Sequence, residues 1–259
     1  MEFSYVDGQR RVAEPDLKGV CDMCGGEMVP KCGKIRIHHW AHRRGQDCDP
    51  WSGKETEWHR EWKQEFPEHC REVTVTSDDD EKHRADVKTD SGLVIEFQHS
   101  PIKLEDRQIR EAFYKDMVWV VDGLRVLKSF DKQIGLAKAL DNTPIKLRVP
   151  KGSCSILKTW ADSMVDVYLD FGDTKLTDSR YYFSRLVLWR LFPGSSETLI
   201  EMAPVWRRDF IDAALNGSSP KGVDDPKMTV MSKPQKSKFN RQKSETDIEY
   251  SLRVWGIDN

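Results

Sequence analysis

Acidic and amide side chains interrupt an apolar run over residues 83–98, where two short strands joined by a tight turn are expected. Asp86 lies between apolar neighbours, and the run ends in a Glu-x-Gln pattern at Glu96 and Gln98. Side chains alternate between strand faces, so Glu96 and Gln98 share one face and Asp86 can lie opposite them. Buried carboxylates need a neutralising cation, and hard oxygen ligands suit Mg²⁺ or Mn²⁺. Ser100 follows as a candidate hydrogen-bond donor to phosphate or backbone.

A helix is expected over residues 54–66, and its polar face adds candidates for the same site. Glu55, His59 and Lys63 recur at steps of four residues, which places them on one face. A separate aromatic stripe indicates the face that packs on the core. Packed on the sheet, this helix lets Glu55 complete the metal ligands, while His59 or Lys63 supplies a proton shuttle or a positive charge. A solvated Glu-His-Lys charge ladder is the alternative.

Another helix is expected from Leu104 to Asp116, and one of its faces offers phosphate-binding side chains. Arg107, Arg110 and Tyr114 follow one another at positions i, i+3 and i+7, opposite apolar residues. The planar guanidinium of arginine suits bidentate phosphate binding. For Arg107 the alternative is an ion pair with the glutamate four residues later.

Residues 17–50 are rich in Cys, His, Gly and basic residues, which is typical of a small metal-binding module. Zinc takes four ligands at tetrahedral corners. Cys21 and Cys24 are separated by two residues and followed by two glycines that permit a sharp turn, and His39 and His42 can complete the set. Reduced thiols and surface histidines are the alternative. Three further residues compete for places in this site: Cys32, Cys48 and His38.

Taken in order, these patterns resemble the competence protein CoiA family of nuclease-like proteins, over roughly residues 15–125. The Asp and Glu-x-Gln strands are similar to the core of PD-(D/E)XK nucleases, with Gln98 where lysine is usual. The resemblance implies a structural zinc and favours His39 and His42 as its ligands. It also implies catalytic Mg²⁺ or Mn²⁺ held by Asp86 and Glu96. The remaining candidate residues are Glu55, His59 and Gln98 in catalysis, and Lys63, Ser100, Arg107, Arg110 and Tyr114 in substrate binding.

The order of expected elements predicts an α/β fold, a restriction-endonuclease-like mixed sheet flanked by helices. The apolar run Met117–Val121 is typical of a buried central strand. Four units are expected along the chain: a zinc-binding N-terminal module at 1–52, a PD-(D/E)XK nuclease-like core at 53–150, a strand-containing C-terminal α+β unit at 151–216, and a flexible basic tail and terminal segment at 217–259.

Composition limits the class of protein. Hydrophobic residues make up 38% and charged residues 32% of the 259, and the formal net charge is −2. Without a long apolar run or a signal-peptide pattern, the sequence predicts a cytoplasmic protein that does not enter the membrane. Six cysteines in a reducing compartment favour metal binding over disulfides. Because the net charge of the whole chain is slightly negative, a nucleic-acid partner must bind a local basic patch.

The predicted function is metal-dependent hydrolysis of DNA phosphodiester bonds, and the resemblance implies a setting of DNA uptake, recombination or defence. Glutamine at position 98 lacks the charge that lysine supplies, although its amide can orient water by hydrogen bonds. Two alternatives stay open. The chain could bind and process DNA as an accessory without cutting it, or it could be a zinc-finger interaction protein whose acidic strand residues are structural.

Overall fold

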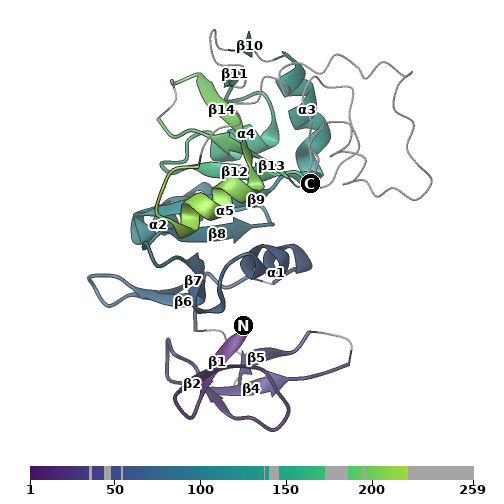
Figure 1. Ribbon diagram of the computed structural model, residues 1–259. Coiled ribbons are helices and arrows are strands. Elements are labelled where there is room, and N and C mark those ends of the chain that lie inside the picture. The colour runs from purple at the N-terminus through teal and green to yellow at the C-terminus, as the bar shows by residue number, and fades with distance from the viewer. Residues whose placement is uncertain are drawn as a thin grey trace, which may run out of the picture.

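The computed structural model of this chain is a mixed α/β structure whose described strands form two sheets (Figure 1). The tail expected over 217–259 is described only as far as residue 220. The described ranges are 1–34, 37–43, 48–53, 55–136, 138–139, 146–172, 186–194 and 196–220.

The N-terminal sheet is antiparallel, with the strand order β2-β1-β3-β4-β5. Its strands are β1 (Phe3–Val6), β2 (Gln9–Val12), β3 (Gly19–Val20), β4 (Glu27–Lys31) and β5 (His39–His42). Asp7 and Gly8 join β1 to β2 with φ values of 49° and 78°, the positive values that a two-residue type I′ hairpin requires. Met28 and Trp40 form the centre of a small core under this sheet.

The second sheet carries most of the chain, in the order β10-β11-β14-β13-β12-β9-β8-β7-β6. Its strands are β6 (Arg71–Thr76), β7 (Lys82–Lys88), β8 (Val94–Gln98), β9 (Met117–Asp122), β10 (Lys138–Ala139), β11 (Leu147–Pro150), β12 (Val167–Asp170), β13 (Val187–Leu191) and β14 (Leu199–Trp206). β9 pairs in parallel with β8 and with β12, and the other neighbours pair antiparallel. The sheet is therefore mixed, and β9 lies in its interior, next to the middle strand β12, as the buried strand that was predicted.

Helices cover both faces of this sheet. They are α1 (Glu57–Gln64), α2 (Leu104–Tyr114), α3 (Leu127–Leu136), α4 (Ser155–Trp160) and α5 (Arg207–Leu215), with short 3-10 turns at Glu68–Cys70 and Leu124–Val126. One apolar core joins the sheet to α2, α3 and α4, and a second core joins its other face to α1 and α5. The sheet is thus the middle layer of a sandwich, and the N-terminal sheet lies next to β6, β7 and α1 (Figure 1).

The expected elements are present with some shifts. The helix predicted over 54–66 is confined to Glu57–Gln64, because Thr56 caps its start and Pro67 disfavours helical backbone before it. The helix α5 begins at Arg207, since Val205 and Trp206 still pair within the sheet.

The boundary expected at residue 150 does not coincide with a sheet boundary. The strands β12, β13 and β14 of the predicted C-terminal unit continue the sheet that begins with the predicted nuclease-like core.

Among the described helices, none combines the length and the apolar character that a bilayer crossing needs.

Candidate functional site

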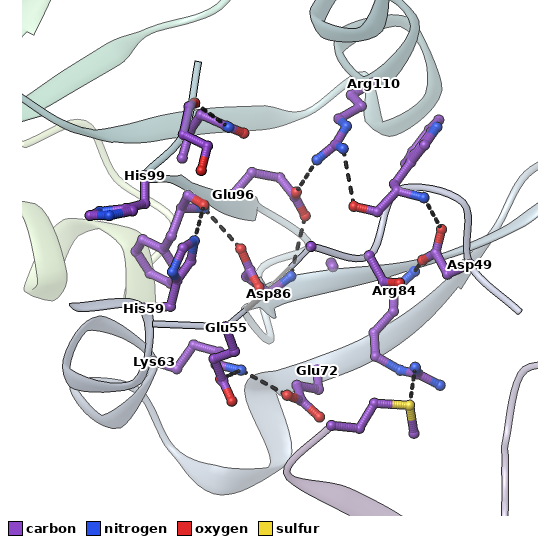
Figure 2. A pocket seen from close by; sticks show the side chains of 18 residues that line it. Asp49, Glu55, His59, Lys63, Glu72, Arg84, Asp86, Glu96, His99 and Arg110 are labelled. Atoms are coloured by element: carbon purple, nitrogen blue, oxygen red, sulfur yellow. Dashed lines mark hydrogen bonds and ion pairs between the residues drawn. The ribbon is translucent and has the colours of Figure 1, made fainter. Parts of the chain in front are cut away.

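The two candidate metal-binding carboxylates lie where β7 and β8 stop pairing through their backbones. The last backbone pair is Val87 with Ile95. Beyond it, side chains bridge the strands: the Asp86 backbone N–H donates to Glu96 Oε1 at 3.2 Å, and the Phe97 N–H donates to Asp86 Oδ2 at 3.0 Å. Both carboxylates line a cavity of about 200 Å³ (Figure 2).

Burial and mutual repulsion make this pair of carboxylates hard to ionise together. Glu96 is 5% exposed. Burial, reinforced by the charge of Asp86, raises its pKa to about 8, although Arg110 Nη1 lies 3.5 Å from Glu96 Oε2 and opposes the shift. Burial also raises the pKa of Asp86, against the opposing charges of Lys63 and His59. The pair therefore gains from any cation that takes the place of the proton.

An open two-carboxylate site fits a hard divalent cation. Mg²⁺ commonly binds one or two protein carboxylates and keeps waters and substrate phosphates as its other ligands. Within the described ranges, groups of three or more His, Cys, Asp or Glu ligand atoms within 4.8 Å occur elsewhere: one in the N-terminal sheet region, and one at His69, Cys70 and Asp90. The cavity thus offers the oxygens of Asp86 and Glu96 and room for solvent or substrate.

Glu55 does not join that pair, because Lys63 holds it. The Lys63 ammonium is 3% exposed and contacts Glu55 and, at 2.7 Å, Glu72 Oε1. Figure 2 shows Lys63 between these two carboxylates. Burial alone would raise the pKa of Glu72, but the charge and hydrogen bond of Lys63 lower it to about 2. Lys63 therefore places a buried positive charge near Asp86, whereas it was predicted to contact substrate directly.

His59 lines the cavity with both ring nitrogens occupied. Its Nε2–H donates to the Phe97 carbonyl at 3.0 Å, and its Nδ1 accepts from the Thr56 backbone N–H at 3.3 Å and faces the Thr56 hydroxyl at 2.8 Å. These contacts cap α1 and fix one neutral tautomer. Burial lowers the pKa of His59, so the expected proton shuttle is a neutral residue that ties α1 to β8.

Gln98 and Ser100 lie at the end of β8, on the cavity rim. The Gln98 side-chain amide donates to the Ser100 carbonyl oxygen at 2.6 Å. This bond holds the backbone after β8 and uses an amide hydrogen that was expected to orient water. Arg110 reaches the same cavity from α2, where it contacts Glu96 and donates to the Trp51 carbonyl at 3.1 Å. Of the three predicted substrate-binding residues on α2, Arg110 alone lines this cavity.

Arg107 and Tyr114, also predicted to bind substrate, lie on a face of α2 that is buried in the protein. Arg107 is 0% exposed, pairs with Glu111 at 3.2 Å and donates to the Thr159 carbonyl, so the alternative ion pair is the one formed. Tyr114 is also buried, within the apolar core. Apolar Ile109 is instead exposed. The buried polar cluster around Glu111 reverses the usual apolar-inward orientation of the helix.

Two acidic residues of the cavity, Glu72 and Asp49, are among those that were not predicted. Glu72 occupies a left-handed backbone position in β6, with φ of 46°, and its neighbours' register places it opposite Asp86. The residues next to Glu72 in the sequence do not indicate this backbone conformation or its position opposite Asp86. Asp49 accepts hydrogen bonds from His83 Nδ1 at 2.9 Å and from the Arg84 backbone N–H at 2.8 Å. Its position next to a cysteine in a metal-binding segment was the one available signal.

The predicted zinc ligands gather in the N-terminal sheet region with one replacement. The ligand atoms of Cys21, Cys24, His42 and Cys48 all lie within 4.8 Å of one another. His39 lies outside this group, and its Nδ1–H donates to the Ile37 carbonyl at 2.9 Å. The prediction of His39 is therefore corrected to Cys48. His39 and His42 are three residues apart on strand β5, so their side chains point to opposite faces.

The geometry of this Cys3His cluster fits zinc. Bonds of about 2.3 Å to sulfur and about 2.05 Å to nitrogen imply tetrahedral edges of about 3.8 Å between sulfurs and about 3.6 Å between sulfur and nitrogen. The Cys21 and Cys48 sulfurs are 3.7 Å apart, and Cys24 Sγ lies 3.3 Å from His42 Nε2. The Gly26 N–H donates to Cys24 Sγ at 3.3 Å. Burial and the neighbouring thiols raise the pKa of Cys48, so a cation is needed to hold all three thiolates.

This cluster lies inside the segment that resembles a known family. Residues 17–50 match the family model of the competence protein CoiA, N-terminal domain. The predicted resemblance to the CoiA family is confirmed over this segment, and the four residues of the Cys3His cluster fall within it. Comparisons with curated proteins and with solved structures gave no significant match.

Proposed function

We propose that this protein is a metal-dependent nuclease that hydrolyses DNA phosphodiester bonds with the PD-(D/E)XK arrangement of residues. The observation that carries the proposal is the cross-bridged pair of Asp86 and Glu96, which faces a solvent-accessible cavity at the separation of β7 and β8. The name of the matched CoiA domain suggests competence, and hence the handling of incoming DNA, as the setting.

The residues around the pair suit phosphodiester chemistry. A divalent cation bound here would neutralise phosphate, activate water and stabilise the leaving oxygen. Asp86 and Glu96 would hold that cation, and Arg110 would balance charge at Glu96 or contact a phosphate once the cation is bound. Lys63 supplies a positive charge near Asp86, and its ion pairs with Glu55 and Glu72 hold the ammonium group in place. Gln98 stabilises the strand end through Ser100.

The test is a cleavage assay on single-stranded, duplex and branched DNA with Mg²⁺, Mn²⁺ or EDTA. Asp86→Asn and Glu96→Gln remove the charges with little change of shape, and Asp106→Asn on the exposed face of α2 is the matched control. Loss of a metal ligand removes several kcal/mol of transition-state stabilisation, so cleavage should fall at least about a hundredfold. Equal cleavage by all three variants, at equal zinc content, would contradict the proposal.

The accessory alternative keeps one observation in its favour. Gln98 uses its amide N–H within the protein, so no residue at this position supplies the charge that lysine gives in related nucleases. A wild-type protein that binds DNA in a metal-dependent manner and leaves every substrate intact would favour a processing accessory. A protein that binds neither DNA nor a divalent cation at Asp86 would favour a zinc-dependent interaction module.

A further inference from the structure

Two routes of direct contact connect the Cys3His cluster with the carboxylate cavity. The first runs through Arg84, which lies on β7 two residues before Asp86. Its Nη2 donates to Asp22 Oδ1 at 2.7 Å and to Cys21 Sγ at 3.5 Å. Asp22 is fixed from a second side, since the Thr74 hydroxyl of β6 donates to its Oδ2 at 2.6 Å. Arg84 therefore joins a zinc ligand to the strand that carries Asp86.

The second route is the chain that leaves Cys48. The next residue, Asp49, is 3% exposed and accepts from both His83 and Arg84, so it attaches this segment to β7. Two residues further on, Trp51 stacks on the His83 ring, and its carbonyl accepts from Arg110. Arg110 is the residue that faces Glu96. Figure 2 shows Arg110 between Glu96 and this segment. The position of Cys48 thus affects the position of Arg110, which is the countercharge of Glu96.

We infer that zinc in the Cys3His cluster and a divalent cation at Asp86 and Glu96 bind cooperatively, with Arg84 as the positioning residue between them. The inference rests on the proposed function, because it requires a cation at the carboxylate pair. Zinc held by three thiolates and one neutral histidine carries one net negative charge, and the Arg84 guanidinium contacts one of those ligands, Cys21. Without zinc, Cys21 and Cys48 are no longer held by a common ion, so both routes to the cavity loosen.

Coupling of this kind is reciprocal and commonly amounts to a change of 5- to 150-fold in affinity. Zinc removal should therefore weaken cation binding at the carboxylates, and Arg84→Gln should weaken it while zinc stays bound. Arg84→Lys keeps the charge but cannot bridge Asp22 and Cys21 in the same plane, so it should restore affinity in part. Lys82→Gln, an exposed residue of the same strand, should leave the affinity unchanged.

The experiment measures Mn²⁺ binding by calorimetry with the full chain, zinc-loaded and zinc-free, and subtracts the heat given by Asp86→Asn. Mn²⁺ competes poorly for thiolate sites, so it reports on the carboxylates. Zinc content is measured by elemental analysis, and folding by circular dichroism. The expected result is an Mn²⁺ dissociation constant about tenfold higher in zinc-free protein and in zinc-reconstituted Arg84→Gln.

Each other result has a defined meaning. Equal Mn²⁺ affinity with and without zinc would overturn the inference while leaving the proposed function intact. Absence of any Mn²⁺ binding that depends on Asp86 in zinc-loaded protein would overturn the proposed function, and the inference with it. If removal of zinc unfolds the whole chain, Arg84→Gln at full zinc content decides, and an unchanged affinity in that variant would overturn the inference.

Discussion

Glu96 decides at the residue scale whether the cavity holds a proton or a cation. Its raised pKa, about 8, means that near neutral pH the folded protein keeps a proton that the unfolded chain releases. A folded state that binds more protons loses stability as pH rises between the unfolded and the folded pKa. In the absence of divalent ions, the contribution of Glu96 therefore makes the free energy of unfolding fall as pH rises from about 4.5 to about 8.

The same shift predicts the pH dependence of cation binding. Because the cation displaces the proton of Glu96, the Mg²⁺ association constant should rise about tenfold per pH unit up to about pH 8 and then level off. Calorimetry between pH 6 and pH 9 checks this, with Asp106→Asn as a control that should follow the wild-type curve. A flat profile would show that Glu96 is already ionised at pH 6.

Lys63 gives a second prediction at this scale, on stability. Lys63→Met leaves Glu55 and Glu72 without their countercharge, and breaking a buried ion pair from one side costs about 3–5 kcal/mol. The lowered pKa of Glu72 contributes stability above about pH 4.5 that is lost as pH falls toward about 2. Urea unfolding at pH 7 and at pH 3 should therefore show a large difference between variant and wild type at pH 7, and a smaller one at pH 3.

The helix α2 carries two arginines in different surroundings: Arg107 is buried in the core, and Arg110 lines the cavity. Glu111 on α2 forms an ion pair with Arg107 at 3.2 Å, and it accepts from Trp119 Nε1 at 3.1 Å and from the Ser163 hydroxyl at 2.8 Å. This polar cluster is buried together with one face of the helix. Arg110, three residues from Arg107, emerges at the cavity instead.

Matched substitutions on α2 should separate these roles. Arg107→Ala leaves the buried Glu111 carboxylate without its countercharge, so it should lower the free energy of unfolding by about 3–5 kcal/mol. It should leave Mn²⁺ affinity unchanged. Arg110→Ala should reduce DNA cleavage with a smaller loss of stability, because Arg110 is closer to solvent. Urea unfolding and cleavage rates measured on both variants test the pair. The reverse pattern would show that Arg107 contacts substrate.

Local patterns predicted the elements that carry the site better than the contacts between them. Period-two alternation located β7 and β8, and four-residue steps located the α1 face with His59 and Lys63. The same reasoning failed on α2, because a buried ion pair is invisible to a rule that turns apolar faces inward. The left-handed backbone of Glu72 accompanies side-chain contacts with Glu2 and Lys63, which the residues next to it in the sequence do not indicate.

At the scale of the whole molecule, the order of strands joins regions that the sequence separates. β11 lies beside β14, and β12, β13 and β14 separate it from β9. The unit expected to follow residue 150 therefore completes the sheet of the unit expected before it. Pairing between strands so distant in the sequence leaves no local pattern, which explains why a boundary was predicted at residue 150.

Truncation tests the continuity of this sheet. A chain of residues 1–150 loses the partners of β9 and β11 and exposes the core around Trp119, so it should lack cooperative thermal unfolding and bind hydrophobic dyes. A chain of residues 1–220 keeps every described strand and should unfold cooperatively, near the midpoint of the full chain. Calorimetry compares the three chains. A cooperative transition in residues 1–150 would establish an independent domain there.

The left-handed backbone at Glu72 has a consequence for how this chain can change over generations. A non-glycine residue in that conformation costs about 1–2 kcal/mol, a cost that Gly would relieve. Gly would also remove the carboxylate that clamps Lys63 and accepts the Glu2 backbone N–H at 2.8 Å. Loss of that buried ion pair costs about 3–5 kcal/mol, more than the strain that Gly would relieve, so stability and the charge of the cavity both favour the acid. Position 72 should therefore resist replacement by Gly even though its backbone conformation favours that residue.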